Sequence, residues 1–284
     1  MPGTEPIHGM ASLFPCYKLM QTVSVVTINR NNSIGLEKTL LSIIAQTYSY
    51  IELVIVDGAS VDGSVNVINK IVSNNQGLVR VLAISEPDSG IYNAMNKGLK
   101  NSTGDYVCYL NSGDIFFDKQ AVENVFSHFN NEDVLYGNLC IHIGSNLKTI
   151  KSNPEVRFFD KYQHDLPPHP AMFVRRSRIL EVGGFEEEYK IIADVVLISR
   201  LFSNRNLSYK CVDVPITIFD LSGVSSKIEN QMLIYGERRK FISRNYPHFI
   251  KDLEKVYRYR KVYFLLTRFR FIRIALSVLK RFIR

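Results

Sequence analysis

The chain has 284 residues, of which 46% are hydrophobic and 22% are charged. This composition is that of a globular protein, and the length allows one large α/β domain or two small ones. The formal net charge of +8 is uneven, because residues 238–284 carry 15 Lys and Arg against 2 acidic residues, which leaves −5 on residues 1–237. An acidic body argues against a nucleic-acid-binding surface, and the basic end indicates contact with an anionic surface.

The N-terminal segment and the cysteines indicate a chain without disulfides. Residues 1–20 have no basic segment ahead of a long apolar run, so we expect a flexible N-terminus and not a secretory signal. The cysteines stand at no metal-ligand or redox spacing, and we expect free thiols in a reducing compartment. They are Cys16, Cys108, Cys140 and Cys211.

The first half of the chain alternates strands with helices. Runs rich in β-branched residues predict buried strands at Thr22–Ile28, Ile51–Val56, Val79–Ser85 and Tyr106–Leu110. Helical spacing between them predicts helices at Leu36–Gln46, Val65–Val72 and Ile91–Leu99. This alternation predicts a parallel, doubly wound sheet, in which the polar residues that end each strand meet at one common edge.

The second half is less regular. We expect, in chain order, a helix at Gln120–Phe129, a strand and turn at Asp133–Ile143, a proline-rich loop at 151–170, a short strand at Ala171–Val174, a helical turn at Ser177–Val182, a helix at Ile192–Phe202, and strands at Tyr209–Val214 and Ile216–Phe219. From Gln231 onward the sequence is helical and basic.

The last 29 residues, Val256–Arg284, form an amphipathic helical pattern, with aromatic and aliphatic residues on one face and basic residues mostly on the other. No apolar run approaches the roughly 20 residues that span a bilayer. We therefore predict a helix that lies in the interface of an anionic membrane. A helix packed on the body, or one that binds a partner protein, remains an alternative.

The tetrapeptide Asn111-Ser112-Gly113-Asp114 follows the fourth predicted strand. Open α/β sheets bind their ligands at the carboxyl ends of such strands. We interpret Asp114 as the ligand of a divalent cation that holds a nucleotide diphosphate. A solvated turn is the alternative interpretation, because Asn, Ser, Gly and Asp all favour turns.

Six segments, in this order, resemble the motifs of the family 2 glycosyltransferases that have the GT-A fold, and the resemblance covers roughly residues 22–225. The segments are Val25–Asn31, Asp57–Ser64, Ser85–Gly98, Gly104–Asp114, His169–Phe173, and Gly183-Gly184-Phe185 followed by Ala193-Asp194. The resemblance implies a Rossmann-like, mostly parallel sheet flanked by helices. It implies a nucleotide-sugar-binding half at 21–115 and an acceptor-binding half at 116–228 of the same domain. The charge and the amphipathic pattern add a helical membrane-surface extension at 229–284.

The resemblance also implies a donor site. In the family, the residue that corresponds to Asp57 contacts uracil, so a UDP-sugar is the expected donor, with Thr27, Asn29 and Arg30 beside it. Asp88 is expected to bind sugar hydroxyls, with a cap of the helix at Ile91 as the alternative. For Asp62 the alternative is a cap of the helix at Val65. The other expected donor-side residues are Asn96, Lys97, Asn111, Ser112 and Asp114, of which Lys97 is equally well explained as a surface lysine.

The expected metal is Mg²⁺ or Mn²⁺, bound through Asp114, and it stabilises the departing nucleotide diphosphate as a Lewis acid. The family motif is usually Asp-x-Asp, and only its last carboxylate is present here. Asp194 matches the general base of the family, with a helix cap as the alternative. Tyr92 and His169 are expected on the acceptor side, although a single His among prolines is often structural.

The expected activity is inverting transfer of one sugar per encounter in bacterial-type polysaccharide or glycan assembly. The chain lacks Trp and thus the Gln-x-x-Arg-Trp motif of processive members. The basic tail suggests a lipid-linked saccharide acceptor at the cytoplasmic face of the membrane. A nucleotidyltransferase, a non-catalytic membrane-peripheral scaffold and nucleic-acid binding through the tail are alternatives, and the oligomeric state stays open.

Overall fold

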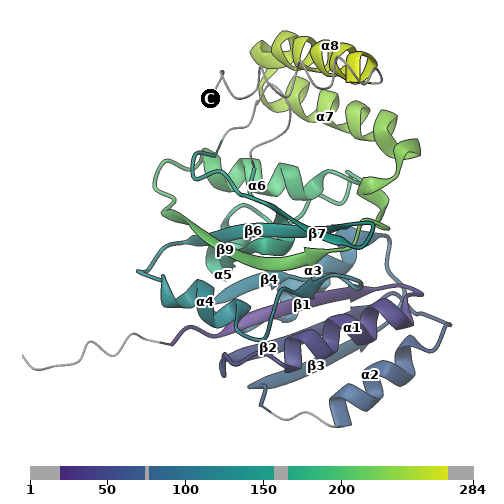
Figure 1. The fold of residues 1–284 in the computed structure, drawn as a ribbon, viewed down its shortest axis with the longest axis vertical. Coiled ribbons are helices and arrows are strands. Elements are labelled where there is room, and N and C mark those ends of the chain that lie inside the picture. Colours follow the sequence, from purple (N-terminus) through teal and green to yellow (C-terminus); the bar gives the residue numbers. More distant parts are fainter. Residues whose placement is uncertain (1–19, 74–76, 157–165, 268–284) are drawn as a thin grey trace, which may run out of the picture.

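A computed structural model of the protein describes residues 20–73, 77–156 and 166–267. These residues form one mixed sheet with helices on both faces (Figure 1), and the strand order is β3-β2-β1-β4-β8-β6-β9-β5, with β7 paired to β6. The α/β class with a GT-A-like sheet is therefore confirmed. The expected flexible segment at 1–20 lies outside the described residues, except for Met20, and residues 268–284 of the expected tail do so as well.

The first half matches the predicted alternation. Strands β1 (Val23–Asn29), β2 (Ile51–Asp57), β3 (Arg80–Ser85) and β4 (Tyr106–Tyr109) pair in parallel, and α1 (Ser33–Ile44), α2 (Ser64–Ser73) and α3 (Ile91–Asn101) connect them. In this register Asn29 stands beside Asp57, and Asp57 stands beside Ser85. The polar strand ends therefore lie at one edge of the sheet, as the sequence predicts.

Two hydrophobic clusters enclose the sheet, one on each face. Neighbouring residues of a strand point to opposite faces, so Val25 and Leu53 pack under α1, α2 and α4, whereas Val26 and Val54 pack under α3, α5 and α6. The strands of the parallel half are therefore buried on both faces, which explains their nearly continuous apolar sequences.

The second half of the sheet mixes directions. Its elements are β5 (Ile115–Phe116), α4 (Ala121–Ser127), β6 (Val134–Ile143), β7 (Asn146–Ile150), β8 (Met172–Arg175), α5 (Arg176–Glu181), α6 (Ala193–Ser203) and β9 (Tyr209–Phe219). Strand β8 runs antiparallel between β4 and β6, while β6 and β9 are parallel. The predicted break between two strands at Pro215 is wrong. Pro215 lies within β9 at a register irregularity opposite Asn138, where its missing N–H is tolerated.

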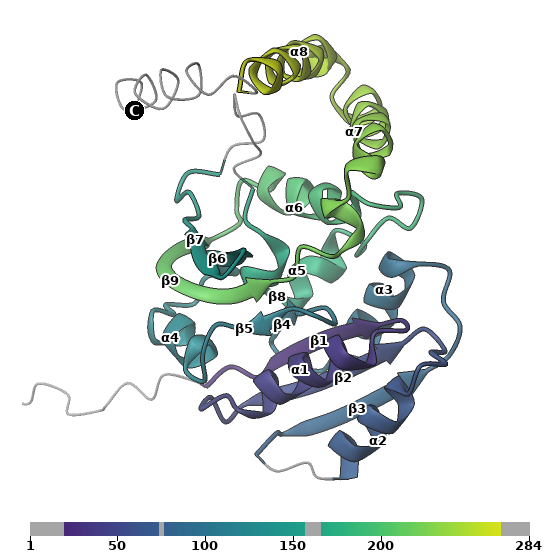
Figure 2. The ribbon, with the colours of Figure 1, turned by 45° about the vertical axis from the view of Figure 1, so that its right-hand side comes forward.

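Helices α7 (Gln231–Asn245) and α8 (Ile250–Thr267) form a hairpin beyond α6 (Figure 2). Helix α7 packs onto the body through Ile234, Phe241 and Ile242, and the rings of Tyr235 and Tyr257 join α7 to α8 at 4.2 Å. Short 3₁₀ turns at His169–Ala171, Val224–Ser226, Ile228–Asn230 and Pro247–Phe249 complete the elements. None of the helices within the described residues has the length and apolarity that crossing a bilayer requires.

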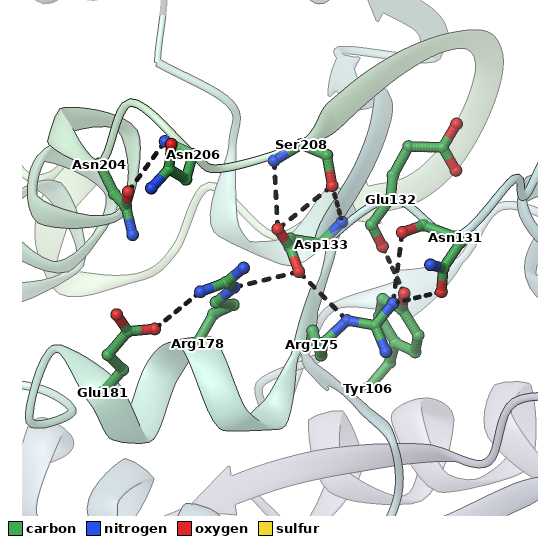
Figure 3. A network of polar contacts seen from close by, with 10 residues as sticks. All are labelled: Tyr106, Asn131, Glu132, Asp133, Arg175, Arg178, Glu181, Asn204, Asn206 and Ser208. Atoms are coloured by element: carbon green, nitrogen blue, oxygen red, sulfur yellow. Dashed lines mark hydrogen bonds and ion pairs between the residues drawn. The ribbon is translucent and has the colours of Figure 1, made fainter.

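A buried carboxylate, Asp133, joins the start of β6 to the neighbouring elements (Figure 3). Its side chain accepts hydrogen bonds from Arg175, Arg178 and both the N–H and hydroxyl of Ser208, at 3.1–3.2 Å. Burial acts to raise the pKa of Asp133, but the bonds from Arg178 and Ser208 outweigh it and lower that pKa. The ionised carboxylate therefore holds β8, α5 and the entry to β9 against β6.

We predict that Asp133→Ala lowers the free energy of unfolding at pH 7 by about 3 kcal/mol, because two arginines lose their buried partner. Since the folded pKa is lowered, this stabilisation is complete above the unfolded value near 4 and is lost as the pH falls through the folded value. Urea denaturation at pH 7 and at pH 3 measures the change. The control Glu181→Gln removes an exposed partner of Arg178 and should cost less than about 1 kcal/mol; equal losses in both variants would contradict this account.

Candidate active site

A cavity of about 600 Å³ opens at the carboxyl ends of β1 and β4, beside the end of β9. Many of the predicted site residues line it, namely Asn29, Arg30, Asp88, Tyr92, Asn111, Ser112, Asp114, His169 and Asp194. The donor-side and acceptor-side predictions therefore meet in one cavity. Four predicted residues do not line it: Thr27, Asp57, Asn96 and Lys97.

Asp57 lies behind the cavity wall. It is fully buried, and its carboxylate accepts hydrogen bonds from Asn29, from the N–H and hydroxyl of Ser60, and from the hydroxyl of Ser85, at 2.6–2.9 Å. Burial acts to raise its pKa, but the bonds from Ser60, Asn29 and Ser85 together lower it. Asp57 is therefore ionised and orients Asn29, which does line the cavity. Its contact with a base stays a prediction, as does that of the buried Thr27.

Two of the four residues outside the cavity hold loops around it. The side chain of Asn96 bonds both the N–H and the carbonyl of Phe185, at 2.9 Å each. Lys97 donates to the carbonyl of Pro87 at 2.8 Å and pairs with Glu86 at 2.7 Å. Both therefore fix backbone that borders the site, and a direct contact with the donor stays a prediction.

Asp62 bears out its capping alternative, whereas the N-cap of α3, Gly90, has no side-chain capping bond. Asp62 accepts hydrogen bonds from Ser33 and Ser64, which begin α1 and α2, and those bonds lower its pKa to about 2. Asp88 accepts from the N–H of Gly90, the residue before α3, at 3.0 Å. Asp88 therefore braces the turn before α3, and it also lines the cavity, 4.0 Å from Arg30.

Asp114 is 3% exposed at the cavity wall, and burial raises its pKa to about 7. Its carboxylate accepts a hydrogen bond from the backbone N–H of Asp220, at 2.8 Å. Gly113 makes this approach possible. Its φ is +108°, and a Cβ on it would lie 2.6 Å from the Asp220 carboxylate. Two acidic side chains and the turn of the tetrapeptide therefore meet at this point.

Asp220 was not among the predicted site residues. It lines the cavity and directly follows β9. The signal that could have found it is the one that marked Asp114, namely a carboxylate just after a strand. The pairing of β9 with β6 and β5, which brings it to this edge, is not visible in the sequence.

The oxygen atoms at this point fit a hard divalent cation. Asp114 and Asp220 offer carboxylates, and the buried side-chain oxygen of Asn111 has no hydrogen-bond partner within the described residues. Mg²⁺ and Mn²⁺ prefer such oxygen ligands and leave further positions for substrate phosphates and water. The described residues contain no cluster of three His, Cys, Asp or Glu side chains, so the protein alone offers few ligands.

Asp194 begins α6 and joins the predicted acceptor side. One oxygen lies 3.1 Å from Nδ1 of His169, and the other accepts from Tyr92 at 3.2 Å and from the N–H of Val195 at 2.9 Å. Burial acts to raise its pKa, but His169, Val195 and Tyr92 outweigh it and lower that pKa. Asp194 is therefore an ionised, oriented base. The Nε2 atom of His169 is buried without a hydrogen-bond partner in the described part of the chain.

Comparison with protein families finds that residues 24–187 match the model described as Glycosyl transferase family 2. An uncharacterized glycosyltransferase of Mycobacterium tuberculosis is 29% identical over 80% of this chain and 86% of its own length. A PGL/p-HBAD biosynthesis glycosyltransferase of Mycobacterium bovis is 27% identical over 72% of this chain and 79% of its own.

Two groups of solved structures share the fold at low identity. TarS 1–349 of S. aureus in complex with UDP has a TM-score of 0.58 at 16% identity, over 85% of this chain and 91% of that chain. A mannosyltransferase from Pyrobaculum calidifontis, in complex with GDP-Man and Mn²⁺, has a TM-score of 0.57 at 16% identity, over 84% of this chain and 65% of that chain.

We predict that Asp114→Asn stabilises the metal-free protein at pH 8. The folded pKa of about 7 lies above the unfolded value, so the folded state loses stability as the pH rises from about 4 to 7. Asn keeps an acceptor for the Asp220 N–H without the charge, and the gain should be about 1–3 kcal/mol at pH 8 and near zero at pH 4. Urea denaturation in EDTA at both pH values measures it. A variant less stable than the natural protein at pH 8 would show that the buried charge is not destabilising.

Proposed function

The chain belongs to glycosyl transferase family 2, and from this premise we propose that it is an inverting enzyme that moves one sugar from a UDP-sugar to a hydroxyl of a lipid-linked saccharide. The observation that carries the proposal is that Asp114 and Asp194 line one cavity yet have environments that shift their pKa values in opposite directions. Carboxylates separated in this way can take different roles in one reaction.

The donor side is proposed at the ends of β1, β2 and β4. Asn29 and Arg30 line the cavity there, and Asp57 holds Asn29 from behind. TarS has been solved with UDP and with UDP-GlcNAc, which supports a nucleotide sugar as the donor. The choice of uridine over guanosine rests on the resemblance at Asp57, because the mannosyltransferase with the same fold has been solved with GDP-Man.

The proposed metal site consists of Asp114 with the oxygens of Asp220 and Asn111. A divalent cation bound there would neutralise the buried charge of Asp114 and stabilise the nucleotide diphosphate as it leaves. The Mn²⁺ in the mannosyltransferase complex supports this choice of cofactor. Asp220 would then supply the second carboxylate that the tetrapeptide Asn111-Ser112-Gly113-Asp114 lacks.

Asp194 is the proposed general base. It is ionised near neutral pH, so it can accept the proton of the acceptor hydroxyl as that oxygen attacks the anomeric carbon. His169 and Tyr92 fix the orientation of its two oxygens. A single attack by an activated hydroxyl inverts the anomeric configuration.

The proposed location is the cytoplasmic face of the membrane, where the helical extension meets anionic lipid. Within the described part of α8, Lys251, Lys255 and Arg258 are exposed, and basic residues near a bilayer surface each contribute roughly 1 kcal/mol of attraction. The enzyme would then bind a lipid-linked acceptor at the membrane and a soluble nucleotide-sugar donor from the solution.

To test the chemistry, a panel of UDP- and GDP-sugars is incubated with Mn²⁺, and nucleotide release is measured. We expect Asp114→Ala to abolish the metal-dependent release. We expect Asp194→Asn to lower turnover at least 100-fold, the scale of a lost general base, while UDP affinity measured by calorimetry stays within twofold. Metal-dependent UDP binding without turnover in any member of the panel would favour the non-catalytic scaffold instead.

To test the location, the full chain is mixed with vesicles of neutral lipid or of neutral lipid with 30% anionic lipid, and the bound fraction is measured by flotation. We expect binding only to the anionic vesicles, and weaker binding at high salt because exposed charges are screened. The triple variant Lys251→Glu, Lys255→Glu, Arg258→Glu should bind at least tenfold less. Equal binding of both proteins would exclude α8 from the membrane surface.

A further inference from the structure

A carboxylate from the helical extension reaches the segment that carries Asp194. Glu237 of α7 is 8% exposed, and its side chain accepts hydrogen bonds from three consecutive backbone N–H groups. Its Oε1 accepts from Lys190 at 2.6 Å, and its Oε2 accepts from Ile191 at 3.1 Å and Ile192 at 3.2 Å. A buried carboxylate with three donors is a specific arrangement, because an unpaired one is costly.

These three N–H groups lie where α6 begins. The first residues of a helix have N–H groups without partners inside the helix, and a side chain usually supplies the missing acceptor. Ile192, the residue before α6, has no side-chain cap. Glu237, 45 residues later in the chain, accepts from the N–H of this N-cap residue and from those of the two residues before it.

The same segment forms part of the cavity. Lys190 and Ile191 line it, and the carbonyl of Ile191 accepts a hydrogen bond from Tyr92 at 2.5 Å. The same hydroxyl lies 3.2 Å from the carboxylate of Asp194, so its one proton is shared between the two acceptors. The peptide of Ile191 is therefore fixed on its N–H side by Glu237 and on its carbonyl side by Tyr92, three residues before Asp194.

Other contacts of α7 hold this helix against residues 188–189, next to the segment that Glu237 binds. Lys240 and Arg244 pair with Glu188 at 2.7 and 2.6 Å, and the ring of Phe241 packs against Tyr189. Helix α7 lies beside α6 in both views of the chain (Figures 1 and 2). These elements lie after residue 187, beyond the segment that matches the family model.

We propose that Glu237 is a positioning residue that sets the place of Asp194 by anchoring the backbone of Lys190–Ile192. The inference rests on the proposed role of Asp194 as general base. It makes the helical extension a part of the catalytic machinery in addition to a membrane-binding element. Small misplacements of a catalytic group carry large penalties in rate, so loss of the anchor should act on turnover and not on donor affinity.

The test measures release of UDP from the UDP-sugar that the panel identifies, with Mn²⁺ present, together with UDP affinity by calorimetry. Glu237→Ala should lower kcat about 10- to 100-fold, with KM for the donor and UDP affinity within twofold. Glu237→Gln keeps one acceptor oxygen and should recover part of the loss, leaving kcat about three- to tenfold below that of the natural enzyme. The matched control Arg239→Ala removes an exposed ion pair of the same helix, to Glu254 of α8, and should change kcat less than twofold.

A double variant separates this inference from the proposed function. If Glu237 acts through Asp194, adding Glu237→Ala to Asp194→Asn should lower kcat no further, whereas an independent structural effect would multiply the two losses. If Asp194→Asn itself turns over normally, the proposed base is wrong. If Asp194→Asn is inactive and a folded Glu237→Gln has the natural kcat, the positioning role is wrong, even where Glu237→Ala fails to fold.

Discussion

The buried carboxylate of Asp114 is the constraint on which the rest of the site depends. A carboxylate charge on a residue that is 3% exposed is unfavourable in the free protein, and burial raises the pKa of Asp114 to about 7. A cation is the partner that would relieve it. Because Gly113 has no side chain, the carboxylate of Asp220 can approach the turn before Asp114 closely.

Asp57, behind the cavity wall, and three carboxylates that line the cavity differ because the fold gives each a different set of donors. Asp57 and Asp194 are surrounded by hydrogen-bond donors that keep them ionised. Asp88 accepts from the N–H of Gly90, and for Asp114 the effect of burial outweighs the hydrogen bonds it receives. Chemically similar carboxylates can therefore take different proposed roles: Asp57 supports the donor pocket, Asp194 acts as the base and Asp114 binds the metal. The same reasoning extends to Glu237, which accepts hydrogen bonds from three backbone N–H groups. These bonds anchor the segment that leads to Asp194.

The sequence predicts the parallel half of the fold and most of the cavity because both follow from local patterns. β-branched runs mark β1–β4, and polar residues at the strand ends mark Asn29, Asn111 and Asp114. The remaining features depend on contacts distant in sequence. Strand β7 is exposed throughout and β5 has two residues, so neither has a hydrophobic pattern. Asp220 and Glu237 reach the site only through the pairing of β9 and the packing of α7.

The most direct test of the account is a crystal structure of the protein with UDP and Mn²⁺. We predict that the manganese is bound by the carboxylate of Asp114, with the diphosphate beside it in the cavity and Asp194 across the space where the sugar would lie. A nucleotide bound away from Asn29 and Arg30, or a manganese held without Asp114, would contradict it.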